Sequence, residues 1–160
     1  MWNCRGLDNT SAVQLISKIA ETTNLSILFL METKQKKGMG KYWTHKWNFE
    51  NFCEVERVGL FGGLLLCWKN INLFVLDASK NFIHTRMKHP TFGLYYFSFV
   101  YGHPKTSKRR VEWNQLVSFQ ENINGLGVVV STSCYPMEID NLQPPKSAQE
   151  HQNYILVYKK

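Results

Sequence analysis

Apolar residues near the start of the chain have the spacing of a helix and then of a buried strand. Within residues 11–23 they recur at intervals of three and four, which predicts an amphipathic helix that Asn9 or Thr10 can cap. Its predicted apolar face consists of Ala12, Leu15, Ile16, Ile19 and Ala20. Residues 25–31 are nearly all apolar and too few for another helix, so they predict a strand buried on both faces, with Glu32 at its carboxyl end.

The middle of the chain is rich in aromatic and β-branched residues. Residues 42–52 are aromatic without a clear period and allow a short helix. Three segments separated by Asn, Lys or Asp predict successive antiparallel strands at residues 64–68, 73–76 and 82–88. The strongest predicted strand is residues 93–101, because nearly every residue there favours β-structure.

The last third of the chain divides into a patterned and an unpatterned part. An apolar stripe predicts a second helix from about residue 107, and residues 128–130 predict one more strand. From Ser131 onward, prolines and polar residues dominate, so we expect one domain over residues 1–130 and an irregular tail over residues 131–160. The order of elements predicts an α+β or layered α/β fold, as a two-sheet sandwich or an open sheet.

Composition narrows the class of protein. A chain of 160 residues that is 44% hydrophobic has enough apolar material for one core. Its longest apolar runs are far shorter than the roughly 20 residues of a membrane span, so we expect no membrane insertion. The first residues show no secretory signal, which predicts an intracellular location, the nucleus included. Nineteen Lys and Arg against twelve Asp and Glu give a net charge of +7, which favours nucleic acid as a partner.

The four cysteines show no metal-binding pattern. Cys4, Cys53, Cys67 and Cys134 are spread along the chain, without a CxxC pair or a histidine at finger spacing. We therefore expect reduced thiols and no zinc site.

Three short segments contain the candidate chemistry. Residues 2–7 (WNCRGL) place Asn3 before Gly6, where a tight turn needs a positive φ. Residues 29–33 (FLMET) place the Glu32 carboxylate where a buried strand meets solvent, and residues 101–104 (YGHP) place a phenol and an imidazole on a rigid turn. Each segment also has an ordinary interpretation, as a turn, a strand-ending acid or polar turn residues.

Taken together, these segments resemble a known superfamily. The ordered set adds residues 62–69 (GGLLLCWK), 80–88 (KNFIHTRMK) and 99–113 (FVYGHPKTSKRRVEW) to the first two segments. It resembles the endonuclease/exonuclease/phosphatase superfamily, with its DNase I-like fold, and in particular the endonuclease domain of plant LINE-type retrotransposons, over residues 2–122. The resemblance implies a four-layered α/β/β/α sandwich and magnesium-dependent hydrolysis of DNA phosphodiesters.

The resemblance also implies roles for individual residues. Glu32 corresponds to the carboxylate that binds the Mg²⁺ ion, and Asn3 supplies an amide oxygen or a hydrogen bond beside it. Tyr101 corresponds to a phenol that contacts the scissile phosphate. His103 receives no role, because Lys105 follows Pro104 where many relatives have Asn. Mg²⁺ prefers oxygen ligands and commonly takes one or two carboxylates together with the phosphate, which agrees with this set.

The chain departs from the family pattern after its middle. The Asp and Asn of the family's Gly-Asp-Phe-Asn motif align with Val129 and Ser131, and the closing His motif would lie beyond Lys160. The resemblance therefore implies a partial, C-terminally truncated domain. General acid–base catalysis contributes about 10²- to 10⁴-fold, so without these groups we expect little activity.

Three functional classes stay open. The chain is a magnesium-dependent endonuclease, a non-catalytic remnant that binds nucleic acid weakly, or a hydrolase of small phosphoesters that shares the fold. DNA contacts are expected from basic loops that neutralise phosphates. One group of basic residues lies among the aromatic residues Tyr42, Trp43 and Trp47; it consists of Lys34, Lys36, Lys37, Lys41 and Lys46. The other group follows Pro104 and consists of Lys105, Lys108, Arg109 and Arg110.

Overall fold

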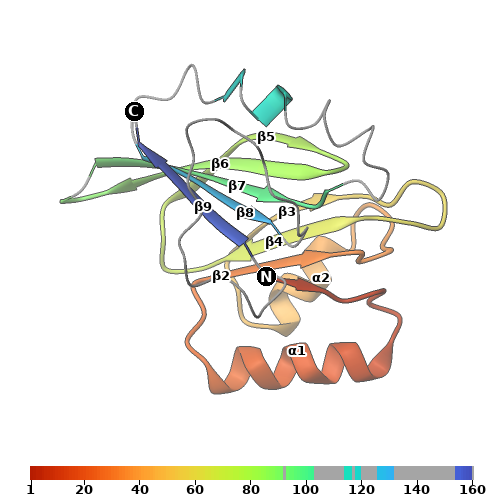
Figure 1. Cartoon of the computed structure of the whole chain (residues 1–160). Coiled ribbons are helices and arrows are strands. Elements are labelled where there is room, and N and C mark those ends of the chain that lie inside the picture. Colours follow the sequence, from red (N-terminus) through yellow and green to blue (C-terminus); the bar gives the residue numbers. More distant parts are fainter. Residues whose placement is uncertain (92, 103–113, 117, 120–125, 132–153, 160) are drawn as a thin grey trace. The chain divides into compact units, whose positions relative to one another are not determined.

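The chain folds into two units, each built around one β-sheet (Figure 1). This computed structural model describes residues 1–91, 93–102, 114–116, 118–119, 126–131 and 154–159. The first unit comprises Met1–Leu73 and Ala78–Lys80, and the second comprises Phe74–Asp77 and Asn81–Lys160. In the described part of the chain, no helix is both long and apolar enough to cross a bilayer.

The first sheet contains four strands in the order β1-β2-β4-β3. β1 is parallel to β2, whereas β4 is antiparallel to both β2 and β3. Every residue of β4 is buried, as its continuous apolar run predicts for a central strand. The strand bounds are Trp2–Asn3 for β1, Ile27–Met31 for β2, Asn51–Val55 for β3 and Leu64–Trp68 for β4.

Helices α1 (Thr10–Thr22) and α2 (Gly40–Lys46) cover one face of this sheet. Figure 1 shows both helices on the same side of β2 and β4. Their side chains share one buried cluster with alternate residues of the central strands. The cluster comprises Cys4, Leu7, Ile16, Leu28, Leu30, Trp43, Trp47, Phe49, Leu65 and Cys67.

Helix α1 forms where the sequence predicts it, and it buries only part of the predicted apolar face. The Asn9 side-chain oxygen accepts hydrogen bonds from Ser11 N at 3.0 Å and Ala12 N at 3.4 Å, which confirms the predicted cap. Leu15 and Ile19 are 47% and 37% exposed, so the predicted apolar face is wrong at these positions.

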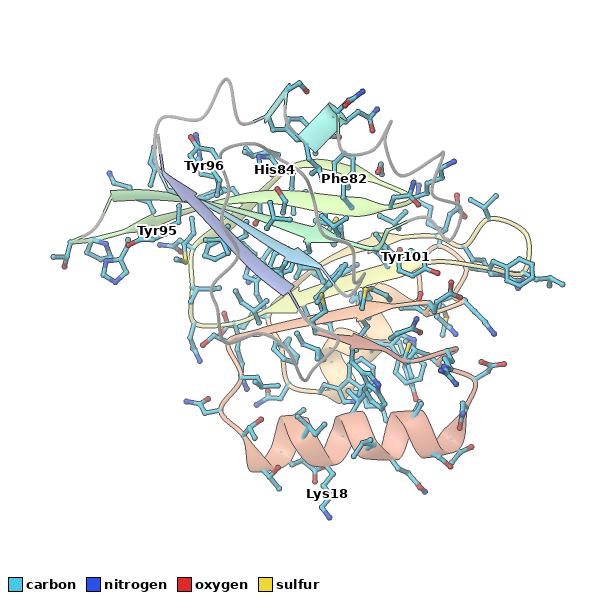
Figure 2. The ribbon with its side chains drawn as sticks, in the orientation of Figure 1. Lys18, Phe82, His84, Tyr95, Tyr96 and Tyr101 are labelled. Atoms are coloured by element: carbon cyan, nitrogen blue, oxygen red, sulfur yellow. The ribbon has the colours of Figure 1, made fainter. Side chains whose placement is uncertain are left out.

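The buried side of α1 is the one that contacts the first cluster and Trp47, the residue after α2. Ala12 and Ile16 are buried, and Val13 and Ala20 pack against the cluster beside them. Trp47 Nε1 donates to Ser17 Oγ at 3.1 Å on the same side of the helix. Figure 2 shows Lys18 pointing away from the sheet.

The segment around α2 differs from its sequence prediction in two ways. The short helix expected within residues 42–52 forms two residues earlier, and β3 begins at Asn51, within the same segment. Trp43 and Trp47 are 7% and 2% exposed and stack with ring centroids 5.0 Å apart. The two tryptophans are therefore core residues, and their predicted place in a basic and aromatic surface is wrong, whereas Tyr42 is 53% exposed.

The second sheet contains five strands in the order β5-β6-β7-β8-β9. β6 and β7 are antiparallel, β7 and β8 are parallel, and β8 and β9 are antiparallel. The strand bounds are Leu73–Ser79 for β5, Phe82–His89 for β6, Gly93–Val100 for β7, Leu126–Ser131 for β8 and Tyr154–Lys159 for β9.

Helical residues cover part of one face of this second sheet. Residues 114–116 and 118–119 are helical, while residues 107–113 of the predicted helix lie outside the described residues. Phe119 packs edge-on to Phe82 and stacks on His84 at 4.6 Å between ring centroids. Figure 2 shows Phe82, His84 and Tyr96 on this face and Tyr95 on the opposite one.

Two sequence predictions about the strands are wrong. The segment at residues 64–68 is not followed by β5 and β6 in one antiparallel run, because β4 lies between β2 and β3 in the first sheet. Residues 154–159, expected to be irregular, form β9 because their aromatic and β-branched side chains suit a strand paired with β8. Residues 132–153 of the expected tail lie outside the described residues.

His84 should make the stability of the second unit sensitive to acid. It is 3% exposed, with Nδ1 2.8 Å from Ser98 Oγ, and burial lowers its pKa against the smaller opposing effect of Asp77. The neutral ring therefore stabilises the fold above about pH 6.5, and this contribution is lost as the pH falls. We expect urea unfolding to show a loss of stability between about pH 7 and about pH 5 that is smaller in His84→Gln. An identical pH dependence in both proteins would contradict this assignment.

Candidate active site

Asn3 and Glu32 lie at the carboxyl ends of two parallel strands. In the register of β1 and β2, Trp2 is opposite Leu30 and Asn3 is opposite Met31, so Glu32 is the next residue along. Parallel strands end at the same edge of a sheet, and loops at that edge are common sites of ligand binding. The structure thus places two of the three residues that the resemblance singled out at the ends of neighbouring strands.

A tight turn fixes the side chain of Asn3. Its Oδ1 accepts a hydrogen bond from Arg5 N at 3.2 Å, and Arg5 and Gly6 have φ angles of 53° and 116°. Cys4 N and Leu7 N then donate to the carbonyls of Met31 and Thr33, each at 3.0 Å. The predicted turn with a positive φ at Gly6 is confirmed, and it keeps the amide of Asn3 beside the end of β2.

Gly62 and Gly63 form backbone hydrogen bonds with the segment that contains Glu32. Glu32 Oε2 accepts a hydrogen bond from Gly62 N at 3.3 Å. Thr33 N and Lys34 N donate to the carbonyls of Gly63 and Gly62 at 3.1 and 2.9 Å. Glu32 and Lys34 have φ angles of 56° and 55°, a left-handed conformation that costs free energy for residues other than glycine. The carboxylate is therefore positioned by long-range backbone contacts at the expense of local strain.

Cys4 lies next to this edge but stays protonated. Its Sγ lies 3.2 Å from the Met31 carbonyl oxygen and 3.6 Å from that of Glu32, with geometry suited to donation by the thiol. Burial raises the pKa of Cys4 to about 11, and the charges of Glu32 and Asp8 act in the same direction. At neutral pH the thiol is therefore neither a nucleophile nor a thiolate ligand.

Tyr101 follows the strongest predicted strand and belongs to the second unit. Its backbone N donates to the Asn81 carbonyl at 2.7 Å, and Figure 2 shows it beyond the end of β7. Val100 is opposite Ser131 in the parallel pair β7 and β8, so Tyr101 lies at the carboxyl edge of that pair. Each unit thus has a predicted site residue where a parallel strand pair ends, and the role of Tyr101 stays a prediction.

Val129 occupies the interior of the second sheet. It is 7% exposed and packs in a cluster with Phe82, Val100 and Leu116. A valine there contributes to the core and cannot accept a proton from water. His103 and the basic residues Lys105, Lys108, Arg109 and Arg110 lie outside the described residues.

The side chains at the carboxyl ends of β1 and β2 are of types that bind a hard cation such as Mg²⁺, but they are few. Glu32 supplies a carboxylate and Asn3 an amide oxygen, which are the ligand types that Mg²⁺ takes. Among the described residues, no cluster of three or more His, Cys, Asp or Glu side chains could hold a metal ion. Asn3 and Glu32 are thus ligands of the types that Mg²⁺ takes, and a complete coordination shell would need further ligands.

Sequence reasoning missed the contact between Gly62 and Glu32. It gave Gly62 and Gly63 no role beyond the segment that contributes to the resemblance, although the positive φ values that consecutive glycines permit were a signal for a special turn. The structure gives φ of 78° and 88° at these two positions. A Cβ added to Gly63 would collide with Thr33 Oγ1, so glycine is required there for a steric reason as well.

No protein-family model matches the chain, and no curated protein matches it. Solved structures with a similar fold include the human Nocturnin catalytic domain with bound sulfate, at a TM-score of 0.58 and 12% identity over 99% of this chain and 80% of that one. Humanized D. rerio TDP2 has a TM-score of 0.56 and 16% identity over 88% and 63%. The 3'-5' exonuclease NExo from Neisseria meningitidis has a TM-score of 0.53 and 14% identity over 82% and 55%.

These similarities establish the fold of the chain. A further structure with a TM-score of 0.56 and 11% identity, covering 91% of this chain and 73% of its own, is an endonuclease/exonuclease/phosphatase family protein from Bacteroides thetaiotaomicron. The two described sheets and their helices thus have the DNase I-like fold, and the predicted fold class is confirmed. The chain spans 63% of the TDP2 chain and 55% of the NExo chain.

The steric restriction that Thr33 imposes at Gly63 can be tested with a matched pair of variants. Gly63→Ala introduces a Cβ that collides with Thr33 Oγ1, whereas Gly59→Ala, at φ 63°, has no heavy atom within 4 Å of the new Cβ. We expect Gly59→Ala to lower the free energy of unfolding by about 1 kcal/mol, and Gly63→Ala by about 2–3 kcal/mol. Urea denaturation measures both, and equal losses would show that Thr33 does not restrict residue 63.

Proposed function

We propose that this chain is a nucleic-acid-binding domain of nuclease fold, related to the LINE-type retrotransposon endonucleases of plants. Glu32 and Asn3 of the first unit bind Mg²⁺ together with a DNA phosphate, and Tyr101 of the second unit contacts phosphate, as the family resemblance implies. The observation that carries the proposal is the register of β1 and β2, because Asn3 and Glu32, whose side chains both have oxygen atoms, lie at the same edge of the sheet. A structural neighbour, the 3' phosphatase NExo from Neisseria, has been solved with a product DNA hairpin, which supports a nucleic-acid ligand.

In the proposed site, hydrogen bonds from the backbone orient the side chains and a bound cation offsets the charge of a phosphate, as a phenol does in the second unit. The Gly62 hydrogen bond orients the Glu32 carboxylate, and the Arg5 hydrogen bond orients the Asn3 amide. When bound, Mg²⁺ would offset negative charge on the phosphate. In the second unit, the Tyr101 hydroxyl donates a hydrogen bond to a phosphate oxygen and so stabilises negative charge on it.

Exposed lysines supply the non-specific part of the binding. Lys36, Lys37, Lys41 and Lys46 are exposed on the loop before α2 and on α2 itself. Each Lys that neutralises a phosphate releases counterions, so affinity falls as salt rises. This term is independent of DNA sequence, which agrees with a domain that binds nucleic acid weakly.

Hydrolysis by this chain is very slow or absent. Val129 is a buried core residue at the position aligned with the family's Asp, and it cannot deprotonate the attacking water. Loss of a general base removes about 10²- to 10⁴-fold of rate. The proposed activity is therefore phosphate binding with divalent cation, without efficient turnover.

The metal site can be tested by substitution of the carboxylate. We expect Mg²⁺ to strengthen DNA binding by the unmodified chain, and Glu32→Gln to abolish this increase while it leaves salt-dependent binding without metal unchanged. Glu21→Gln, which removes an exposed carboxylate of α1, is the control and should behave like the parent. Fluorescence anisotropy with labelled DNA at several Mg²⁺ concentrations measures the effect.

Two results would revise the proposal in different ways. The same response to Mg²⁺ in Glu32→Gln and the parent would eliminate Glu32 as a ligand. Rapid nicking of supercoiled plasmid by the parent, abolished by Glu32→Gln, would retain the site and overturn the inference that turnover is inefficient.

A further inference from the structure

The connection between β3 and β4 exposes a group of large apolar side chains. Val58, Leu60 and Phe61 are 68%, 69% and 71% exposed, above every other large apolar side chain among the described residues, of which Phe74 is next at 55%. Figure 1 shows this connection extending well past the ends of the two strands. We call residues 58–61 the apolar finger. Large apolar side chains grouped in water commonly mark a binding surface.

Backbone hydrogen bonds hold the apolar finger in a defined shape. Val58 N donates to the Phe61 carbonyl at 3.0 Å, and Phe61 N donates to the Val58 carbonyl at 3.3 Å. These two bonds close a two-residue hairpin turn, in which Gly59 adopts a φ of 63°. Arg57 N donates to the Gln35 carbonyl at 3.0 Å and anchors the base of the finger. The exposed side chains are therefore presented by a fixed turn.

The apolar finger is joined directly to the candidate metal carboxylate. Gly62 follows Phe61 in the chain and donates its N–H to Glu32 Oε2 at 3.3 Å. Its carbonyl accepts from Lys34 N at 2.9 Å. A ligand that contacts Glu32 thus lies next to the base of the finger.

Basic side chains outnumber acidic ones at the base of the apolar finger. Arg57 lies at its start next to the exposed Glu56, and the neighbouring segment around Gln35 contains Lys34, Lys36 and Lys37. The Glu54 carboxylate accepts hydrogen bonds from Gly38 N and Gly40 N, each at 2.6 Å, so its charge is engaged with the backbone. An apolar tip on a basic base fits a polyanion that also exposes apolar faces.

We propose that the apolar finger contacts unpaired bases beside the phosphate bound at Glu32, so that the chain prefers DNA containing unpaired bases to continuous duplex. The proposal rests on the proposed function, because it places DNA at Glu32. In a continuous duplex the faces of the bases are covered by their neighbours. Unpaired bases expose these faces, on which Phe61 can stack and Leu60 and Val58 can pack, while the lysines bind the backbone.

The test compares two labelled DNAs of equal length, one fully paired and one with a central unpaired bubble. Binding is measured by anisotropy in EDTA, so that the result is independent of the metal site. We expect the parent chain to bind the bubble about ten-fold more tightly, the effect of roughly one stacked base. The double variant Leu60→Ser/Phe61→Ser should lose this preference and retain its affinity for paired DNA.

A matched control separates the finger from general loss of apolar surface. Leu15→Ser removes a 47% exposed apolar side chain from α1 and should keep the preference for the bubble. Thermal unfolding of the double variant should match that of the parent, because both replaced side chains lie in solvent.

Several outcomes would overturn the proposal. These are equal binding of the two DNAs by the parent, an unchanged preference in the double variant, and loss of the preference in Leu15→Ser. Finger-dependent binding to phosphatidylserine vesicles without any preference for the bubble would assign the finger to a membrane surface and also overturn it. A bubble preference in EDTA together with no response to Mg²⁺ would support the finger while refuting the metal site, so the two proposals fail separately.

Discussion

The parallel pairing of β1 with β2 is the constraint on which the candidate site depends. Because Asn3 is opposite Met31, the amide and the Glu32 carboxylate leave the sheet at the same edge. Gly62 then restrains the carboxylate through a backbone hydrogen bond, at the start of the connection into the buried strand β4. A shift of one residue in this register would turn the side chain of Asn3 to the other face of the sheet.

The sequence predicted the positions of individual helices and strands better than it predicted which elements they pack against or pair with. The apolar runs of β2 and β4 and the cap of α1 are local signals, and the structure confirms them. Which face of α1 is buried, and which sheet contains β4, depend on contacts between distant residues such as Trp47 and Ser17. No period or propensity within one segment contains that information.

For the candidate site, too, the sequence contained the local signals but not the contacts between distant residues. The resemblance singled out Asn3 and Glu32 together, and the structure places them at one edge. The restraint by Gly62, thirty residues from Glu32, could not be predicted because it depends on how β4 returns to the sheet. The buried tryptophans of α2 were misassigned because a basic and aromatic composition does not reveal which side chains face the core.

Val129, which the resemblance aligns with the family's Asp, is a core residue in this structure. Burying a valine there contributes about 1.5–3 kcal/mol to the core of the second sheet. A carboxylate in the same apolar cluster would lose its hydration, and it would be costly unless a cation or hydrogen bonds compensated for that loss. The apolar strand interior at Val129 is thus suited to holding the sheet together and unsuited to proton transfer.

The left-handed backbone at Arg5, Glu32 and Lys34 has a consequence for engineering. Each of these residues has a φ between 53° and 56°, in a region where glycine would be relaxed. At position 5 a glycine would relieve the strain and leave the proposed binding side chains in place. At positions 32 and 34 it would remove the acid or a lysine that the proposals assign to binding, so stability could be gained there only at the expense of those side chains.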